Sequence, residues 1–168
     1  MKPRIIVSAA ALIAVTALGC DGPQPTESPI SAPLFTTTTT VIAATIGPLV
    51  VAVPGRTWVS GGIVHTRDQV QVGPVSGDIV GTISVVANAN VALGTLDGTG
   101  FGTLTITTAA GTWEGSFQGR FAGGLFADRV VAQGRGGLDG FKLMGSFAET
   151  GPATSTYMLT AEIVNPGS

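Results

Sequence analysis

Side chains able to do acid–base chemistry are scarce in this chain of 168 residues, which has a single histidine, His65, and 10 aspartates and glutamates. Asp68 follows three residues after His65, and a carboxylate can orient a histidine that acts as a general base. In a strand, however, residues three apart point to opposite faces, so only a turn between them would bring the two together. We therefore predict an exposed histidine at a strand end rather than a catalytic pair.

The remaining carboxylates indicate turns rather than a metal site. Four of them stand beside glycine, alanine or leucine at apparent turns: Asp78, Asp97, Asp128 and Asp139. Carboxylates at turns usually accept hydrogen bonds from backbone amides, and no loop here has the D-x-D-x-D spacing of a calcium site. One histidine and one cysteine cannot form a His/Cys metal cage. The sequence therefore predicts no metal and no cofactor.

Nucleophilic catalysis has no recognisable motif. No serine lies in G-x-S-x-G, and the glycine pairs at 61–62, 123–124 and 136–137 neither precede a helix nor carry a following Lys-Ser/Thr that would mark a phosphate cradle. The only thiol, Cys20, ends a leader-like segment. We therefore predict no catalytic residue.

The N-terminal residues have the pattern of a targeting signal. Lys2 and Arg4 precede an uncharged run over 5–18 that is too short to span a bilayer. The run ends in Ala17-Leu18-Gly19-Cys20, which resembles the bacterial lipobox. That resemblance implies cleavage after residue 19 and a lipid on Cys20; the alternatives are ordinary cleavage nearby or a buried free thiol. We expect a lipoprotein anchored to a membrane of the bacterial cell envelope.

Composition limits the partners and the layout. Charged residues make up 11% of the chain, against roughly 25% on average, and a net charge of -2 with a pI near 5.1 argues against nucleic-acid binding. After the signal peptide (1–19), residues 20–33 are rich in proline and predict an extended tether. The threonine run over 36–40 either extends the tether or begins the first strand. A folded domain is expected over 34–168.

Alternating apolar residues predict an all-β domain without amphipathic helices. Short Val/Ile/Thr/Phe runs are separated by glycine and by turn signals such as Asp97-Gly98 and Asp139-Gly140. About eight strands result, which suits a small antiparallel barrel or a sandwich. Glycines inside the strands favour the barrel, because a strongly coiled sheet needs them at its corners.

Aromatic residues recur on the face predicted to point inward. Trp113, Phe117 and Phe121 alternate with a polar row, Glu114, Ser116, Gln118 and Arg120, that we expect on the wet outer face. The aromatic rings either fill the barrel or leave a slot for a small apolar ligand. The residues that would line such a slot are Trp113, Phe117, Phe121, Phe141, Phe147 and Tyr157.

The C-terminal part carries a glycine-rich pattern: Gly134-Arg135-Gly136-Gly137-Leu138-Asp139-Gly140-Phe141, then Gly145-Ser146-Phe147, then Tyr157-Met158-Leu159. With Gly111-Thr112-Trp113-Glu114-Gly115 before it, this segment resembles the allene-oxide-cyclase-like barrels, which include dirigent proteins. The resemblance covers about the last third of the chain. It implies an eight-stranded barrel with an apolar interior, and no catalytic residue transfers to this sequence.

Three functions follow as hypotheses. The first is a lipid-anchored, non-enzymatic binding or structural module. The second is a carrier of a small apolar ligand, and the third is a cofactor-free cyclase or isomerase. A filled core would favour the structural module and an empty apolar cavity the carrier. A buried polar group with a shifted pKa among the aromatic rows would favour the enzyme.

Overall fold

The computed structural model describes residues 37–151 and 154–165. The chain divides into two units, 1–33 and 34–168, and all described residues belong to the second. The predicted signal peptide, the tether and Cys20 therefore lie outside the described residues. None of the described residues belongs to a helix that is long and apolar enough to cross a membrane.

The described residues form strands and no helix, which confirms the all-β prediction. The strands are β1 (Thr38–Ile46), β2 (Val50–Val53), β3 (Arg56–Ser60), β4 (Ile63–Gly77), β5 (Gly81–Ala92), β6 (Gly98–Thr108), β7 (Gly111–Ala122), β8 (Leu125–Gly136), β9 (Lys142–Glu149) and β10 (Tyr157–Asn165). The threonine run thus contributes Thr38–Thr40 to the first strand.

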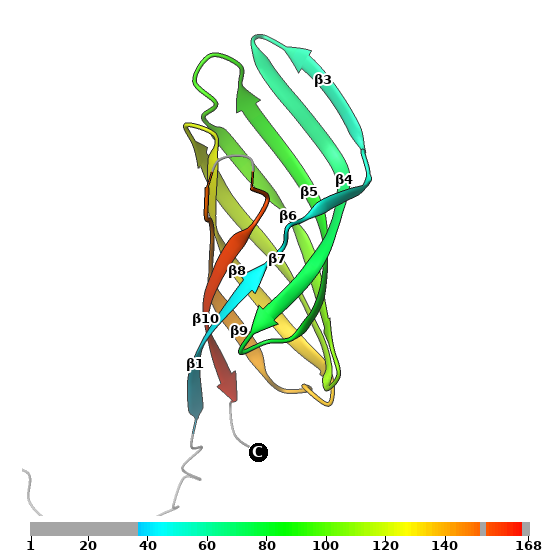
Figure 1. Ribbon diagram of the computed structural model, residues 1–168, viewed down its shortest axis with the longest axis vertical. Coiled ribbons are helices and arrows are strands. Elements are labelled where there is room, and N and C mark those ends of the chain that lie inside the picture. The colour runs from blue at the N-terminus through cyan, green and yellow to red at the C-terminus, as the bar shows by residue number, and fades with distance from the viewer. Residues whose placement is uncertain (1–36, 152–153, 166–168) are drawn as a thin grey trace, which may run out of the picture. The chain divides into compact units, whose positions relative to one another are not determined.

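The strands pair antiparallel and close into a ring (Figure 1). Around the ring the order is β1, β10, β9, β8, β7, β6, β5 and β4, and β4 pairs back with β1 through Ala44–Gly77, Thr45–Ser76 and Ile46–Val75. The ring therefore contains the expected eight strands. The short strands β2 and β3 are additional and pair with β4 alone.

The chain leaves the ring directly after β1. Gly47 has a φ of 100°, a region that favours glycine, and its peptide bond to Pro48 is cis. The Gly47 N–H donates to the Pro74 carbonyl over 2.9 Å, and the Leu49 N–H donates to the Ser155 carbonyl over 2.8 Å. From here β2 and β3 follow the first half of β4 outward (Figure 1). β1 consequently bridges β10 and β4 at one end of the ring only.

The predicted inner and outer faces of β7 are confirmed. Trp113 and Phe117 are buried and Phe121 is half-buried, whereas the alternating Glu114, Ser116, Gln118 and Arg120 are exposed. The inner rows of the other strands join this face in one apolar core. Its largest fully buried side chains are Ile46, Ile83, Ile106, Val130, Leu143 and Leu159.

Candidate functional site

A cavity of about 130 Å³ opens at the end of the ring where β1 turns away. It lies among the inward-facing residues near the ends of β1, β7 and β9 and the beginnings of β6, β8 and β10, and β4 and β5 complete it. The lining consists of Ile46, Leu49, Thr66, Gln69, Gln71, Ile83, Val85, Ala87, Asn88, Ala89, Gly100, Phe117, Phe121, Phe126, Asp128, Phe147 and Tyr157.

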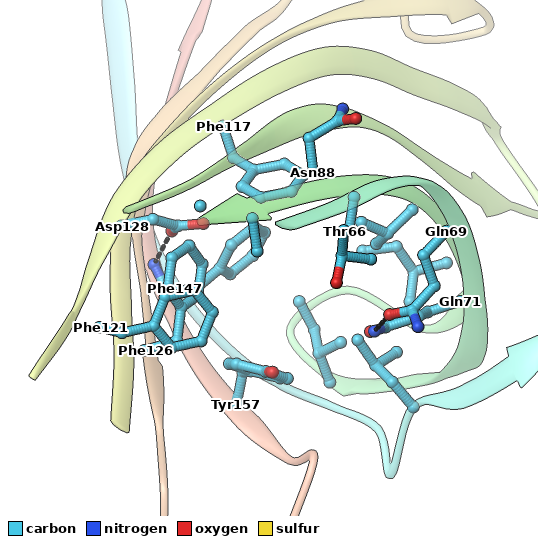
Figure 2. Close-up of a pocket in the computed structure, with 17 residues that line it drawn as sticks. Thr66, Gln69, Gln71, Asn88, Phe117, Phe121, Phe126, Asp128, Phe147 and Tyr157 are labelled. Atoms are coloured by element: carbon cyan, nitrogen blue, oxygen red, sulfur yellow. Dashed lines mark hydrogen bonds between the residues drawn. The ribbon is translucent and has the colours of Figure 1, made fainter. Parts of the chain in front are cut away.

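The cavity has two chemically different walls (Figure 2). On one side Asp128 extends from β8 among the rings of Phe117, Phe126 and Phe147. Neutral polar side chains from β4 stand opposite, namely Thr66, Gln69 and Gln71, and the Gln71 Nε2 donates to the Gln69 Oε1 over 2.6 Å. A ligand between these walls would meet a carboxyl and aromatic rings on one side and uncharged groups on the other.

Asp128 is the chemically most unusual residue of the site, because its carboxyl is buried without full hydrogen bonding. The residue is 7% exposed, and its Oδ1 accepts a hydrogen bond from the Phe147 backbone N–H over 3.0 Å. Its Oδ2 is buried and has no hydrogen-bond partner within the described part of the chain. A buried oxygen of this kind is costly unless a partner arrives, so a ligand that donates a hydrogen bond would stabilise it.

Burial raises the pKa of Asp128 to about 7, although the hydrogen bond from Phe147 opposes the shift. The carboxyl therefore exchanges its proton near neutral pH. Burial, and then the charges of Glu149 and Asp128, raise the pKa of the Tyr157 phenol to about 12, so the phenol stays protonated. Glu149 itself accepts a hydrogen bond at Oε2 from the Phe126 N–H over 3.2 Å. Two carboxyl groups thus act on the Tyr157 phenol, and that of Asp128 shares the cavity lining with it.

A glycine makes the room that Asp128 occupies. Gly119 pairs with Asp128 across β7 and β8. A Cβ at residue 119 would collide with the Ala127 carbonyl and with the Cβ of Asp128. Any larger residue would displace the carboxyl, so Gly119 allows the strands to approach closely at this point.

The aromatic rings hold one another in defined positions. The rings of Phe117 and Phe126 meet edge to face, with centroids 6.1 Å apart at 83°. The Phe121 ring lies 4.6 Å from that of Phe126 at 37°. Such pairs contribute about 0.5–1.5 kcal/mol beyond their buried area. The wall around Asp128 is therefore rigid and apolar.

Of the six aromatic residues proposed from the sequence, four line the cavity: Phe117, Phe121, Phe147 and Tyr157. Trp113 and Phe141 do not. Trp113 is buried in the opposite half of the ring, where it pairs with Ile106 and Gly134, and Phe141 precedes β9 at that same end. The inner row of a strand runs the whole length of the ring, whereas the cavity occupies one end.

The prediction that Asp128 lies at a turn is wrong. It lies inside β8, where the burial alternates regularly, with Phe126, Asp128, Val130 and Ala132 inside. This alternation is visible in the sequence and indicates a buried Asp128. The turn prediction instead relied on the usual preference of aspartate for turns. The turn prediction holds for the other three. Asp78 Oδ2 accepts from the Ala43 N–H over 2.8 Å, Asp97 Oδ1 accepts from the Gly123 N–H over 2.9 Å, and Asp139 lies in the turn before β9.

His65 belongs to a separate cluster away from the cavity. Its Nδ1 lies 2.8 Å from the Asn90 Oδ1, and its ring stacks on Trp58 at 5.1 Å, so it is half-buried rather than exposed. Asp68 instead pairs with Arg56 over 3.5 Å. The register of β4 shifts between Thr66 and Gln69, but this irregularity does not bring His65 and Asp68 together as a base and its orienting acid.

No three acidic, histidine or cysteine side chains of the described ranges come together as a metal site. The arrangement around Asp128 can accept a hydrogen bond or a positive charge, and it can take up or release one proton near neutral pH. No model of a known protein family matches the chain, and no curated protein matches its sequence. The resemblance to allene-oxide-cyclase-like barrels stays a prediction.

Proposed function

We propose that this protein is an envelope lipoprotein, anchored through Cys20, that holds a small and mainly apolar molecule in the open end of its ring. The observation that carries the binding role is the cavity of about 130 Å³ among Phe117, Phe121, Phe126, Phe147 and Tyr157. An engineered apolar cavity of about 150 Å³ binds benzene. The cavity here suits a molecule of similar size, on the order of six to eight non-hydrogen atoms.

The binding role is tested with benzyl alcohol and the full chain carrying Cys20→Ser, which cannot be lipidated. We expect binding in about the millimolar range, because small ligands gain limited free energy per atom. Ala87→Leu, in the lining, should fill the cavity and abolish binding. Ala127→Leu, on the exposed outer face of β8, should leave binding unchanged.

Calorimetric titration of the three chains decides the outcome, with thermal unfolding as a check that each is folded. Saturable binding that Ala87→Leu removes and Ala127→Leu keeps would support the proposal. Absence of binding, or equal binding by both variants, would contradict it.

The lipid anchor rests on the uncharged run that ends at Gly19-Cys20. Cys20→Ser should abolish metabolic palmitate labelling and release the protein from membranes. Labelling that persists in the Cys20→Ser protein would exclude Cys20 as the anchor.

A second function, a cofactor-free isomerase, is favoured by the buried Asp128, whose pKa of about 7 suits proton transfer at neutral pH. The test is 3-cyclohexenone, which becomes the conjugated 2-cyclohexenone when a base removes a proton from C2 and the same proton returns to C4. Absorbance of the conjugated product reports the reaction. A rate above background that Asp128→Asn removes would support this function, and an equal rate in both proteins would exclude it for this substrate type.

A further inference from the structure

We propose that the molecule held in the ring is a small organic cation, an ammonium group attached to an apolar or aromatic body, with its charge placed at Asp128. This inference deepens the proposed binding role and rests on it. Asp128 Oδ2 is buried, lacks a hydrogen-bond partner among the described residues and belongs to a residue of the cavity lining.

Within residues 37–151 and 154–165, no cationic side chain lines the cavity to neutralise that oxygen. The arginines of the neighbouring strands, Arg120 on β7 and Arg129 on β8, are exposed on the outer face. In β4, the Arg67 guanidinium lies over the rings of Trp58 and Phe101 and outside the lining. The carboxyl therefore has no counter-ion in the cavity lining among the residues that the structure describes.

The charged groups that act on the neighbouring Tyr157 phenol are negative rather than positive. Glu149 on β9 and Asp128 both act on the Tyr157 phenol of β10 and raise its pKa. The other charged residue of β9, Lys142, pairs with Gln133 toward the opposite end of the ring. A cation entering here meets the Asp128 carboxylate and a neutral phenol, both in the lining. An anion would meet the repulsion of the Asp128 carboxylate and no cationic side chain among the lining residues.

The aromatic wall suits the same ligand. The lining places Phe117, Phe126 and Phe147 around Asp128 (Figure 2), and the face of an aromatic ring attracts a cation, most strongly where water is excluded. The rings also cover the apolar body of the ligand. A neutral hydrocarbon would use the rings and leave Asp128 Oδ2 without a partner, so the site distinguishes a cation from its neutral analogue.

The experiment compares benzylammonium with benzyl alcohol, two probes of similar shape that differ in charge. At pH 8 we expect the full chain carrying Cys20→Ser to bind benzylammonium about 10- to 100-fold more tightly, because hydrogen bonds between charged partners are the strong ones. Asp128→Asn should lose that preference while its affinity for benzyl alcohol changes less than about 3-fold. Asp139→Asn, an exposed carboxyl at the turn before β9, is the matched control and should keep the preference.

A pH series on the same protein tests the assignment without changing Asp128. Only the carboxylate form attracts the cation, and its fraction falls about tenfold per pH unit below a pKa of about 7. Between pH 8 and pH 5.5 the affinity for benzylammonium should therefore fall about 30-fold, and the affinity for benzyl alcohol should stay nearly constant.

The two proposals fail in different ways. If benzyl alcohol binds but benzylammonium binds no more tightly, or if the preference survives in Asp128→Asn, the cation assignment is wrong and the binding role stands. If neither probe binds, the binding role fails and the cation assignment fails with it. A preference that is lost in Asp128→Asn, kept in Asp139→Asn and weakened at pH 5.5 establishes the inference.

Discussion

The two ends of the ring are built from the same strands and yet differ in what fills them. At one end Ile106, Trp113 and Leu143 are buried and packed without a described cavity. At the other end, on the same inner rows, Phe121, Asp128 and Phe147 surround an opening of about 130 Å³. The inner row of β7 passes from one end to the other between Trp113 and Phe121.

The difference arises from the path of the chain between β1 and β4. β1 pairs with β10 along its whole length and with β4 only through Ala44–Ile46, so it joins the two strands up to the edge of the cavity, which Ile46 lines. Beyond Ile46 the chain turns away at Gly47, and β2 and β3 pair with β4 only. The open end therefore has no strand that draws β4 against β10. One early turn thus separates the packed end of the ring from the end that holds the cavity.

The largest expected loss of stability comes from truncating an aromatic residue of β7 at the packed end, compared with one at the open end. Trp113→Ala should lower the free energy of unfolding by about 3–5 kcal/mol, because it leaves a cavity in a packed core. Phe121→Ala, at the half-buried open end, should cost only about 1–2 kcal/mol. Urea denaturation measures both values. Equal losses would show that the two ends are packed alike.

Protonation of Asp128, at the open end, should make the free energy of unfolding depend on pH. Its folded pKa is raised from 3.8 to about 7, so the folded state holds a proton that the unfolded state releases. The stabilisation is fully present below about pH 4 and is lost as the pH rises through 7, by up to about 4 kcal/mol. Asp128→Asn should flatten this dependence while its amide oxygen keeps the hydrogen bond from Phe147. Urea titrations from pH 4 to pH 8 measure the slope, and parallel curves for the two proteins would refute the assignment.

Added volume should be tolerated at one end and harmful at the other. Ala161→Leu, at a residue 3% exposed in the packed half, should cost about 1–3 kcal/mol through overpacking. Ala87→Leu places the same extra atoms in the cavity and should change stability by less than about 1 kcal/mol. Thermal unfolding of the pair measures this contrast, and a larger loss for Ala87→Leu would show that the open end is already filled.

The smallest change in stability is expected for a substitution on the outer face of the ring, which is exposed along β7. Gln118→Ala, between the buried Phe117 and the half-buried Phe121, should change stability by no more than about 0.5 kcal/mol because the side chain is exposed. A loss comparable to that of a core residue would mean that this face of β7 is covered in the native protein, and that the ring has a partner there.

The sequence alone was enough to predict which side chains of a strand point inward and which point outward. A strand places consecutive side chains on opposite faces whatever surrounds it. Trp113 and Phe117 inside, with Glu114 and Gln118 outside, follow from that local rule, as does the all-β class. The same rule applied to Phe126, Asp128 and Val130 would have placed the carboxyl inside. The preference of aspartate for turns gave the wrong prediction.

The position of the cavity depended on tertiary structure. Nothing in the alternation of Phe117, Phe141 or Phe147 indicates which end of the ring stays open, because that depends on where β1 stops pairing with β4. The burial of Asp128 Oδ2 also results from contacts between the neighbouring strands β7, β8 and β9, which the alternation within one strand does not reveal. Local patterns determine which way a side chain points, whereas the closure of the sheet decides what it meets there.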